Sequence, residues 1–379
     1  MSPAARLAGL GTTIFTEMTA LAVRTGAINL GQGFPDTDGP AAVIEAAVQA
    51  LRDGENQYAP LPGVPALREA IREHQRQWYG LEPEDVLVTF GATEAIASAV
   101  MGLCDPGDEV IVFEPSYDSY TACVTFAGAT CRFVTMHPPD FALDPDTLRA
   151  AIEGGRGRVR AVLLNTPHNP TGRVLSRAEL EAVADACIER DLVCITDEVY
   201  EHLVFDGEHI PLAALPGMAE RTLTISSVGK SFSVTGWKIG WCSGPAALVA
   251  AARTVKQFLT FAGGTPLQHA AAAALRLPRA ELDGLREDLR AKRDQLCAGL
   301  AAAGLAPIVP AGTYFINADV GTEAGQWCAT LPERCGIVAI PTSVFYDDKD
   351  AAPTLVRFAF CKRPEVIAEA ARRLAALSS

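Results

Sequence analysis

The chain has 379 residues, of which 49% are hydrophobic and 20% are charged, and a formal net charge of −13 at pH 7. This composition is that of an ordinary globular protein and excludes an intrinsically disordered one, and the length allows one large and one smaller domain. The acidic balance argues against a protein that binds nucleic acid or anionic membranes.

The termini, cysteines and histidines predict a soluble cytoplasmic protein without a metal site. The N-terminus lacks a basic segment followed by a sustained apolar one, so we expect no cleaved signal peptide. No stretch approaches the roughly 18 uncharged apolar residues that a spanning helix needs. The ten cysteines form no Cys-x-x-Cys pair and the six histidines are dispersed, which predicts free, reduced thiols and neither zinc nor a redox motif.

In the first two-thirds of the chain, short apolar, β-branched runs alternate with helical segments. Strands are expected at 86–90, 109–113, 159–164, 192–196 and 222–226, and helices at 93–103, 117–126 and 176–190. This alternation is typical of a buried, mostly parallel sheet covered by helices on both faces, so we predict a large α/β domain over 36–262. Ligands of such sheets bind in the loops after the carboxyl ends of the strands.

After about residue 262 the pattern changes. A long amphipathic helix is expected at 279–305, strands at 314–320, 336–340 and 355–360, and a closing helix at 364–377. These elements predict a smaller α+β domain over 263–379. Residues 1–35 precede the main sheet and are expected to lie against, and belong to, this smaller domain.

Three strings at the ends of predicted strands carry the chemistry, and they lie at 165–172, 196–200 and 226–240. The third contains Lys230, whose Ser-Gly-Ser-Phe surroundings are unlike those of a solvated surface lysine. A lysine amine condenses with an aldehyde and is the side chain that anchors pyridoxal phosphate through a Schiff base. Asp197 follows a strand buried on both faces and therefore needs a cationic partner, unless it only caps a turn.

These strings, with Gly31-Gln32-Gly33-Phe34-Pro35 and Val356-Arg357-Phe358, resemble the class I/II aminotransferases of the pyridoxal-phosphate superfamily, fold type I. The likeness covers nearly the whole chain and is nearest to the branch with kynurenine/glutamine, methionine and N-succinyldiaminopimelate aminotransferases. It implies a large domain with a mostly parallel, seven-stranded sheet, a smaller α+β domain, pyridoxal 5'-phosphate as cofactor, and a homodimer with shared active sites.

The resemblance assigns roles around the cofactor ring. Lys230 would be the covalent anchor and the proton carrier at the substrate Cα, and Asp197 would pair with the pyridine nitrogen. Asn169 and Tyr200 would donate hydrogen bonds to the phenolate oxygen, and Tyr117 would stack on the ring. The plainer alternatives are that Asn169, which precedes a proline, is a turn residue and that Tyr117 belongs to the core.

The resemblance also implies a phosphate site. Ala92 and Thr93 open a helix directly after a strand, where free N–H groups face outward, and Ser227 and Lys238 would join them. Many relatives carry arginine at position 238, and lysine keeps the charge without the bidentate fork. The plainer alternative for Thr93 is that it is the N-cap of this helix. Tyr58 would reach the phosphate of the other subunit.

Substrate binding is implied for three further residues. Arg357 lies within an apolar strand, where a buried guanidinium requires an anion; by resemblance this is the substrate α-carboxylate, and otherwise a structural carboxylate. Gly33 would bring its backbone close to the same group. Phe15 would line the pocket, and the other expected wall positions are Phe34, Gly263, Gly264, Thr313, Tyr314, Ser343 and Phe345. Gly263 and Gly264 would make room for a longer side chain, or act as a hinge.

The implied reaction moves an amino group from an L-amino acid with a sizeable, acylated or aromatic side chain to a 2-oxo acid, 2-oxoglutarate, by a ping-pong cycle. Two alternatives stay open. A cysteine S-conjugate β-lyase shares the cofactor and the Cα deprotonation. A non-catalytic ligand-sensing protein of this fold carries an added DNA-binding domain, which we do not expect here.

Overall fold

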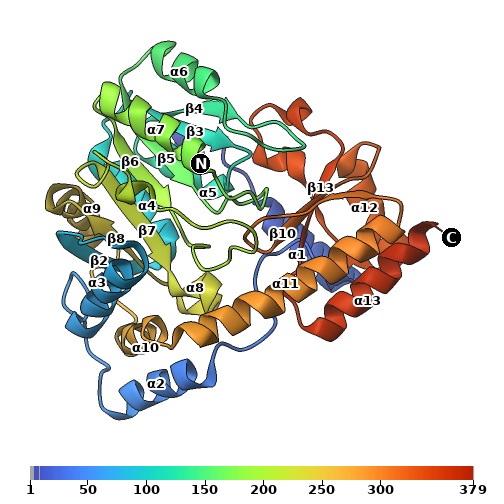
Figure 1. The fold of residues 1–379 in the computed structure, drawn as a ribbon, viewed down its shortest axis with the longest axis horizontal. Helices are drawn as coiled ribbons and strands as arrows, with labels where there is room; N and C mark the ends of the chain where they lie inside the picture. The colour runs from blue at the N-terminus through green and yellow to red at the C-terminus, as the bar shows by residue number, and fades with distance from the viewer. Residues whose placement is uncertain (1–3, 8, 379) are drawn as a thin grey trace.

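A seven-stranded sheet organises the larger part of the chain (Figure 1). The computed structural model describes residues 4–7 and 9–378. The strands, in spatial order, are β2 (Asp85–Phe90), β8 (Ile239–Gly244), β7 (Thr222–Ser227), β6 (Val193–Asp197), β5 (Val159–Asn165), β3 (Glu109–Glu114) and β4 (Thr130–Thr135). Only β8 runs antiparallel to its neighbours, and the other adjacent pairs are parallel. The predicted mostly parallel sheet is confirmed.

Helices cover both faces of this sheet, as Figure 1 shows. The helices of this part of the chain are α2 (Ala41–Arg52), α3 (Pro65–Tyr79), α4 (Gly91–Leu103), α5 (Asp118–Phe126), α6 (Pro145–Glu153), α7 (Arg177–Glu189), α8 (Val228–Ser231), α9 (Ala246–Leu259) and α10 (Thr265–Leu275). Among them, α2 packs on α10 and lies away from the strands. Because both faces are covered, every residue of β3, β6 and β7 is buried. The sequence signal for the start of α7 is also present in the structure, where Ser176 and Glu179 form a complete capping box.

Two strands of this sheet were not predicted from the sequence. β4 is an edge strand whose residues are mostly half-buried, so it lacks a continuous apolar run. β8 contains Gly240 and Gly244, which weaken any strand signal. Position 240 has to be glycine because β8 packs closely against the start of α4. A Cβ there would lie 2.6 Å from the carbonyl carbon of Gly91.

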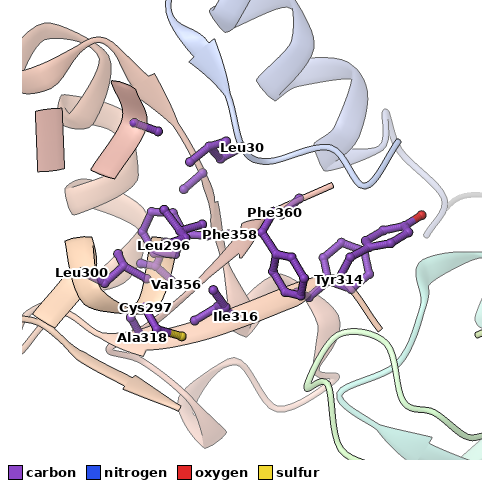
Figure 2. Packing of buried hydrophobic residues seen from close by; sticks show 14 of the residues in the cluster. Leu30, Leu296, Cys297, Leu300, Tyr314, Ile316, Ala318, Val356, Phe358 and Phe360 are labelled. Carbon is purple, nitrogen blue, oxygen red and sulfur yellow. The ribbon is translucent and has the colours of Figure 1, made fainter. Parts of the chain in front are cut away.

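The C-terminal part forms a second layer built on a four-stranded antiparallel sheet. Its strands, in spatial order, are β12 (Ile340–Pro341), β13 (Leu355–Ala359), β10 (Phe315–Asp319) and β9 (Ala306–Ile308), and its helices are α11 (Arg279–Ala302), α12 (Ala324–Cys335) and α13 (Pro364–Ala375). α11 packs along α13. Figure 2 shows Leu296 and Leu300 of α11 packed against Val356 and Phe358 of β13, and all four are fully buried.

The N-terminal segment joins this second layer. After α1 (Ile14–Thr25), β1 (Ile28–Asn29) pairs in parallel with β11 (Ile337–Val338). The expected single strand at 336–340 is therefore two short strands, because the chain leaves β1 at Ala339 and pairs with β13 from Ile340 onward. The domain boundaries stay a prediction. α10 packs on α2 and α3, which favours placing the second boundary after residue 275 rather than at 262.

Across the described residues, no helix is long and apolar enough to cross a membrane.

Candidate active site

A cavity of about 250 Å³ lies at the carboxyl ends of β5, β6 and β7, where parallel α/β sheets bind ligands. It brings together all but one of the site residues predicted from the sequence. Those that line it are Phe15, Gly33, Ala92, Thr93, Tyr117, Asn169, Asp197, Tyr200, Ser227, Lys230, Lys238 and Arg357. Tyr58 is the exception, since it is 81% exposed and lies outside the cavity.

Asp197 is a buried carboxylate without a cationic partner among the described residues. It ends β6 and is 5% exposed. Its Oδ2 accepts a hydrogen bond of 2.7 Å from the Tyr120 hydroxyl, and its Oδ1 accepts a longer one of 3.3 Å from the Val199 N–H. Burial raises the pKa of Asp197 to about 6, which the Tyr120 hydrogen bond opposes. A cation placed here would satisfy the carboxylate.

Lys230 is an enclosed amine in the short helix α8. Its Nζ lies 3.5 Å from the Gly33 carbonyl oxygen and 5.9 and 5.7 Å from the ring centroids of Tyr200 and Tyr314. Burial lowers its pKa to about 8, with the positive charges of Lys238 and Arg357 acting in the same direction. A larger fraction of this amine is therefore neutral, and so nucleophilic, at neutral pH than for a solvated lysine.

The start of α4 and Lys238 form an anion site. α4 begins at Gly91 directly after β2, so Ala92 and Thr93 lie in its first turn, where N–H groups lack helical acceptors. The reading of Thr93 as N-cap is wrong, because Phe90 occupies that position. Lys238 lies beside this turn: a Cβ on Gly91 would be 3.1 Å from its Nζ. Within the described chain, this ammonium makes no hydrogen bond or ion pair.

Arg357 is a fully buried guanidinium that lines the cavity from β13 of the smaller sheet. Its Nη1 donates to Asn169 Oδ1 at 2.9 Å and its Nη2 to the Gly31 carbonyl at 3.0 Å, while its Nε has no partner. Among the described residues no carboxylate pairs with it, so the alternative of a structural salt bridge is not what the structure contains. Burial lowers its pKa to about 10. The rings of Phe315 and Phe345 lie 4.1 and 4.5 Å from the guanidinium carbon.

The aromatic walls differ in part from those expected. Phe15 lies 6.2 Å from Tyr117 and 6.0 Å from Phe345, measured between ring centroids, and so closes one side of the cavity. Gly33 could not carry a side chain, since a Cβ would lie 2.4 Å from the Phe315 ring. Phe34 lines the cavity, whereas Thr313, Tyr314, Ser343 and Phe345 stand behind it.

Gly263 and Gly264 do not line the cavity at all. A Cβ on Gly263 would lie 2.0 Å from the Phe90 ring, and Gly264 has φ +64 with a Cβ position 2.8 Å from Ile239. These glycines are required by close packing and a left-handed turn, not by room for a substrate.

Two site residues were missed by reasoning from the sequence. Tyr120 holds Asp197, and its position one helical turn after Tyr117 was the available signal. Asn165, the last residue of β5, donates to the Asp197 carbonyl at 2.7 Å and accepts from the Asn169 N–H at 2.7 Å. It was overlooked because its role is to fix the backbone of the two neighbouring site residues.

Known proteins resemble this chain along almost its entire length. The probable N-succinyldiaminopimelate aminotransferase of Mycobacterium tuberculosis is 51% identical over 98% of each chain, and methionine aminotransferase of Escherichia coli is 41% identical over 98% of this chain and 97% of its own. Human kynurenine–oxoglutarate transaminase 3 is 37% identical over 96% of this chain and 88% of its own.

Solved structures agree with these relatives. The N-succinyldiaminopimelate aminotransferase of Mycobacterium tuberculosis superposes with a TM-score of 0.96, covering 99% of this chain and 100% of that one. The aspartate aminotransferase of Thermus thermophilus superposes with a TM-score of 0.91 at 34% identity over the whole of both chains.

The profile described as "Aminotransferase class I and II" matches residues 25–374. That family uses pyridoxal phosphate to move amino groups between amino acids and 2-oxo acids. The chain therefore belongs to the class I and II aminotransferases and is an enzyme of amino-group transfer.

Proposed function

We propose that the cavity binds pyridoxal 5'-phosphate and that the enzyme uses it to move an amino group from an L-amino acid to 2-oxoglutarate. The observation that carries the proposal is that two buried, unpaired charges, Asp197 and Arg357, line the same cavity as the Lys230 amine. Each of the two requires a ligand of opposite charge, and the cofactor and an amino acid supply both.

The residues present suit the cofactor. Asp197 would hold the protonated pyridine nitrogen, and the hydroxyl of Tyr120 would keep the carboxylate oriented toward it. The unpartnered Lys238, Ser227 and the first turn of α4 would hold the phosphate. Gly240 and Gly91 lie close together beside this phosphate site, and neither places a side chain in it. Tyr117 would cover the ring, and Asn169 and Tyr200 would bind the phenolate oxygen.

Bound there, pyridoxal phosphate supplies an aldehyde that takes up the amino group and an electron-withdrawing ring that makes the substrate Cα–H acidic. Lys230 would hold the cofactor covalently through its amine. The same amine would carry the proton from the substrate Cα. Its pKa of about 8 suits both tasks, because general acid–base transfer is most efficient near the working pH.

Arg357 would orient the amino acid by binding its α-carboxylate. The guanidinium is held by Asn169 and the Gly31 carbonyl, and its remaining N–H groups are free for an anion. The surrounding rings of Phe15, Phe315 and Phe345 keep water away, which strengthens a charge-assisted hydrogen bond.

The proposed amino donor has a sizeable side chain that is acylated or aromatic. Support comes from the 51% identity to the probable N-succinyldiaminopimelate aminotransferase, with the methionine and kynurenine enzymes further away. The proposed location, the cytoplasm, stays a prediction.

The proposed assembly is a homodimer. Four exposed apolar side chains form a patch: Phe258 and Leu259 at the end of α9, Phe261 just after it, and Tyr58 in the loop between α2 and α3. The ring centroids of Tyr58 and Phe261 lie 5.7 Å apart. Such a patch favours a protein partner. A second copy would cover it, and Tyr58 would reach the phosphate site of that copy.

Replacement of Lys230 tests the covalent anchor. Lys230→Ala should abolish both the visible absorbance of the covalent link to the cofactor and transamination, because the Lys230 amine is the group proposed to form that link. Absorption spectra and a coupled amino-transfer assay measure the two effects, with the exposed Lys349→Ala as the matched control. Visible absorbance and activity that persist in purified Lys230→Ala would refute the assignment.

Replacement of Arg357 tests the carboxylate site. Arg357→Ala should raise KM for the amino donor tenfold or more, since each charged hydrogen bond contributes about 1.5–3 kcal/mol. Cofactor content should stay near that of the wild type, and Arg363→Ala, whose side chain is 55% exposed, should change neither quantity. Loss of cofactor with an unchanged KM would mean that Arg357 serves the cofactor instead.

A donor panel tests the substrate class. Wild-type enzyme with 2-oxoglutarate should use N-succinyl-L,L-diaminopimelate with a higher kcat/KM than kynurenine, methionine or glutamine. The readout is glutamate formation, and pyruvate formation from a cysteine S-conjugate is followed in parallel. A marked preference for a small donor such as alanine, or pyruvate as the main product, would contradict the proposal.

The assembly is tested by light scattering. The wild type should be a dimer, and Phe258→Asp should move it toward the monomer because a charge would be buried in the interface. Val309→Asp, at another exposed apolar position, is the control. A monomeric wild type at micromolar concentration would exclude the shared active site.

A further inference from the structure

A cluster of two histidines and a glutamate lies outside the cavity, next to two of its lining residues. His74 comes from α3, and Glu201 and His202 follow Tyr200 in the turn after β6. His74 and His202 are 3% and 8% exposed, and their Nε2 atoms lie 2.8 Å apart with the rings nearly perpendicular. The possible ligand atoms of all three residues lie within 4.8 Å of one another.

The hydrogen-bonding pattern favours a proton between the imidazoles over a metal ion. A metal bound by both Nε2 atoms would require a proton on both Nδ1 atoms, and metal-bound histidines normally donate that proton to a fixed acceptor. The Nδ1 of His74 is buried and has no partner, so a proton there would be an orphaned donor. With the proton on Nε2 instead, His74 donates to His202 and its Nδ1 is only an unused acceptor.

Glu201 connects this imidazole pair to the active-site strands. Its Oε1 accepts a hydrogen bond of 2.6 Å from the hydroxyl of Ser226, which immediately precedes Ser227 in β7. No lysine or arginine of the described chain forms an ion pair with Glu201. Burial alone would raise the pKa of Glu201, and the hydrogen bond from the Ser226 hydroxyl opposes that rise. Burial also lowers the pKa of the His74 and His202 imidazoles, which favours their neutral forms.

The cluster therefore ties three elements together behind the cavity. Tyr200 and Ser227 both line the cavity, they belong to different strand ends, and the Glu201–Ser226 hydrogen bond links the residues adjacent to each. His74 adds α3 to this link through His202. An apolar side chain at position 201 would leave the Ser226 hydroxyl without this acceptor.

We propose that His74, Glu201 and His202 are positioning residues that hold Tyr200 and Ser227 at the separation the cofactor requires. This inference rests on the proposed function, since Tyr200 is taken to bind the cofactor's phenolate oxygen and Ser227 its phosphate. Glu201 is the central member, because it accepts the hydrogen bond from Ser226 and is followed directly by His202, which contacts His74.

The test measures cofactor binding rather than turnover. Apoprotein of the wild type, Glu201→Ala and Glu201→Gln is titrated with pyridoxal phosphate by absorbance well below each variant's Tm. Glu201→Ala should weaken binding by about tenfold, the loss expected for a hydrogen bond to a charged group. The pKa of the visible absorbance should also rise, because a weakened Tyr200 hydrogen bond lets the chromophore keep its proton to a higher pH. Glu201→Gln, which can still accept from Ser226, should recover part of both effects.

Controls separate this inference from its alternatives. Glu208→Gln, an exposed position in the same loop, should match the wild type. If Glu201→Ala lowers only Tm and leaves the affinity and the absorbance pKa unchanged, the cluster is merely structural and the inference fails. One equivalent of zinc in the purified wild type, lost in His202→Gln, would replace the hydrogen-bonded pair with a metal site and also overturn it. Failure of the wild type to bind pyridoxal phosphate would refute the proposed function itself.

Discussion

The site depends on two charges that the fold buries without neutralising. Asp197 and Arg357 are both enclosed, and neither has an ion-pair partner in the described chain. Leaving an ion unpaired in a medium of low polarity costs several kcal/mol, so the folded protein sacrifices stability at this point. The surrounding hydrogen bonds from Tyr120 and to Asn169 lessen the cost without removing it. Under the proposed function, the cofactor and the amino acid would relieve this cost by bringing a charge of opposite sign to each residue.

The two layers of the fold divide this task between them. The large sheet supplies Asp197, Asn169 and the start of α4 from the end of β6, the loop after β5 and the segment directly after β2, which all line the cavity. Arg357 comes instead from β13 of the smaller sheet. Its hydrogen bond to Asn169 crosses between the layers, so the proposed substrate site lies where the two layers meet.

Much of this arrangement was predictable because the chemistry is concentrated at strand ends. The strands before Asn165, Asp197 and Ser227 are rich in apolar and β-branched residues, and a parallel sheet has few other places for the polar residues that follow them. The shapes of the walls were not predictable. Gly263 is small because the Phe90 ring lies against it, and that contact joins segments distant in sequence. Tyr120 likewise gains its role only when α5 packs beside β6. Long-range packing of this kind leaves no local pattern.

The central claim is that the buried Lys230 amine is the one group that binds the cofactor covalently. Reduction of the holoenzyme with borohydride, followed by peptide mass spectrometry, tests it most directly. The account predicts a single phosphopyridoxyl group, on the peptide that contains Lys230. Labelling of Lys238 or of a surface lysine instead, or no labelling of a preparation that carries the cofactor, would contradict it.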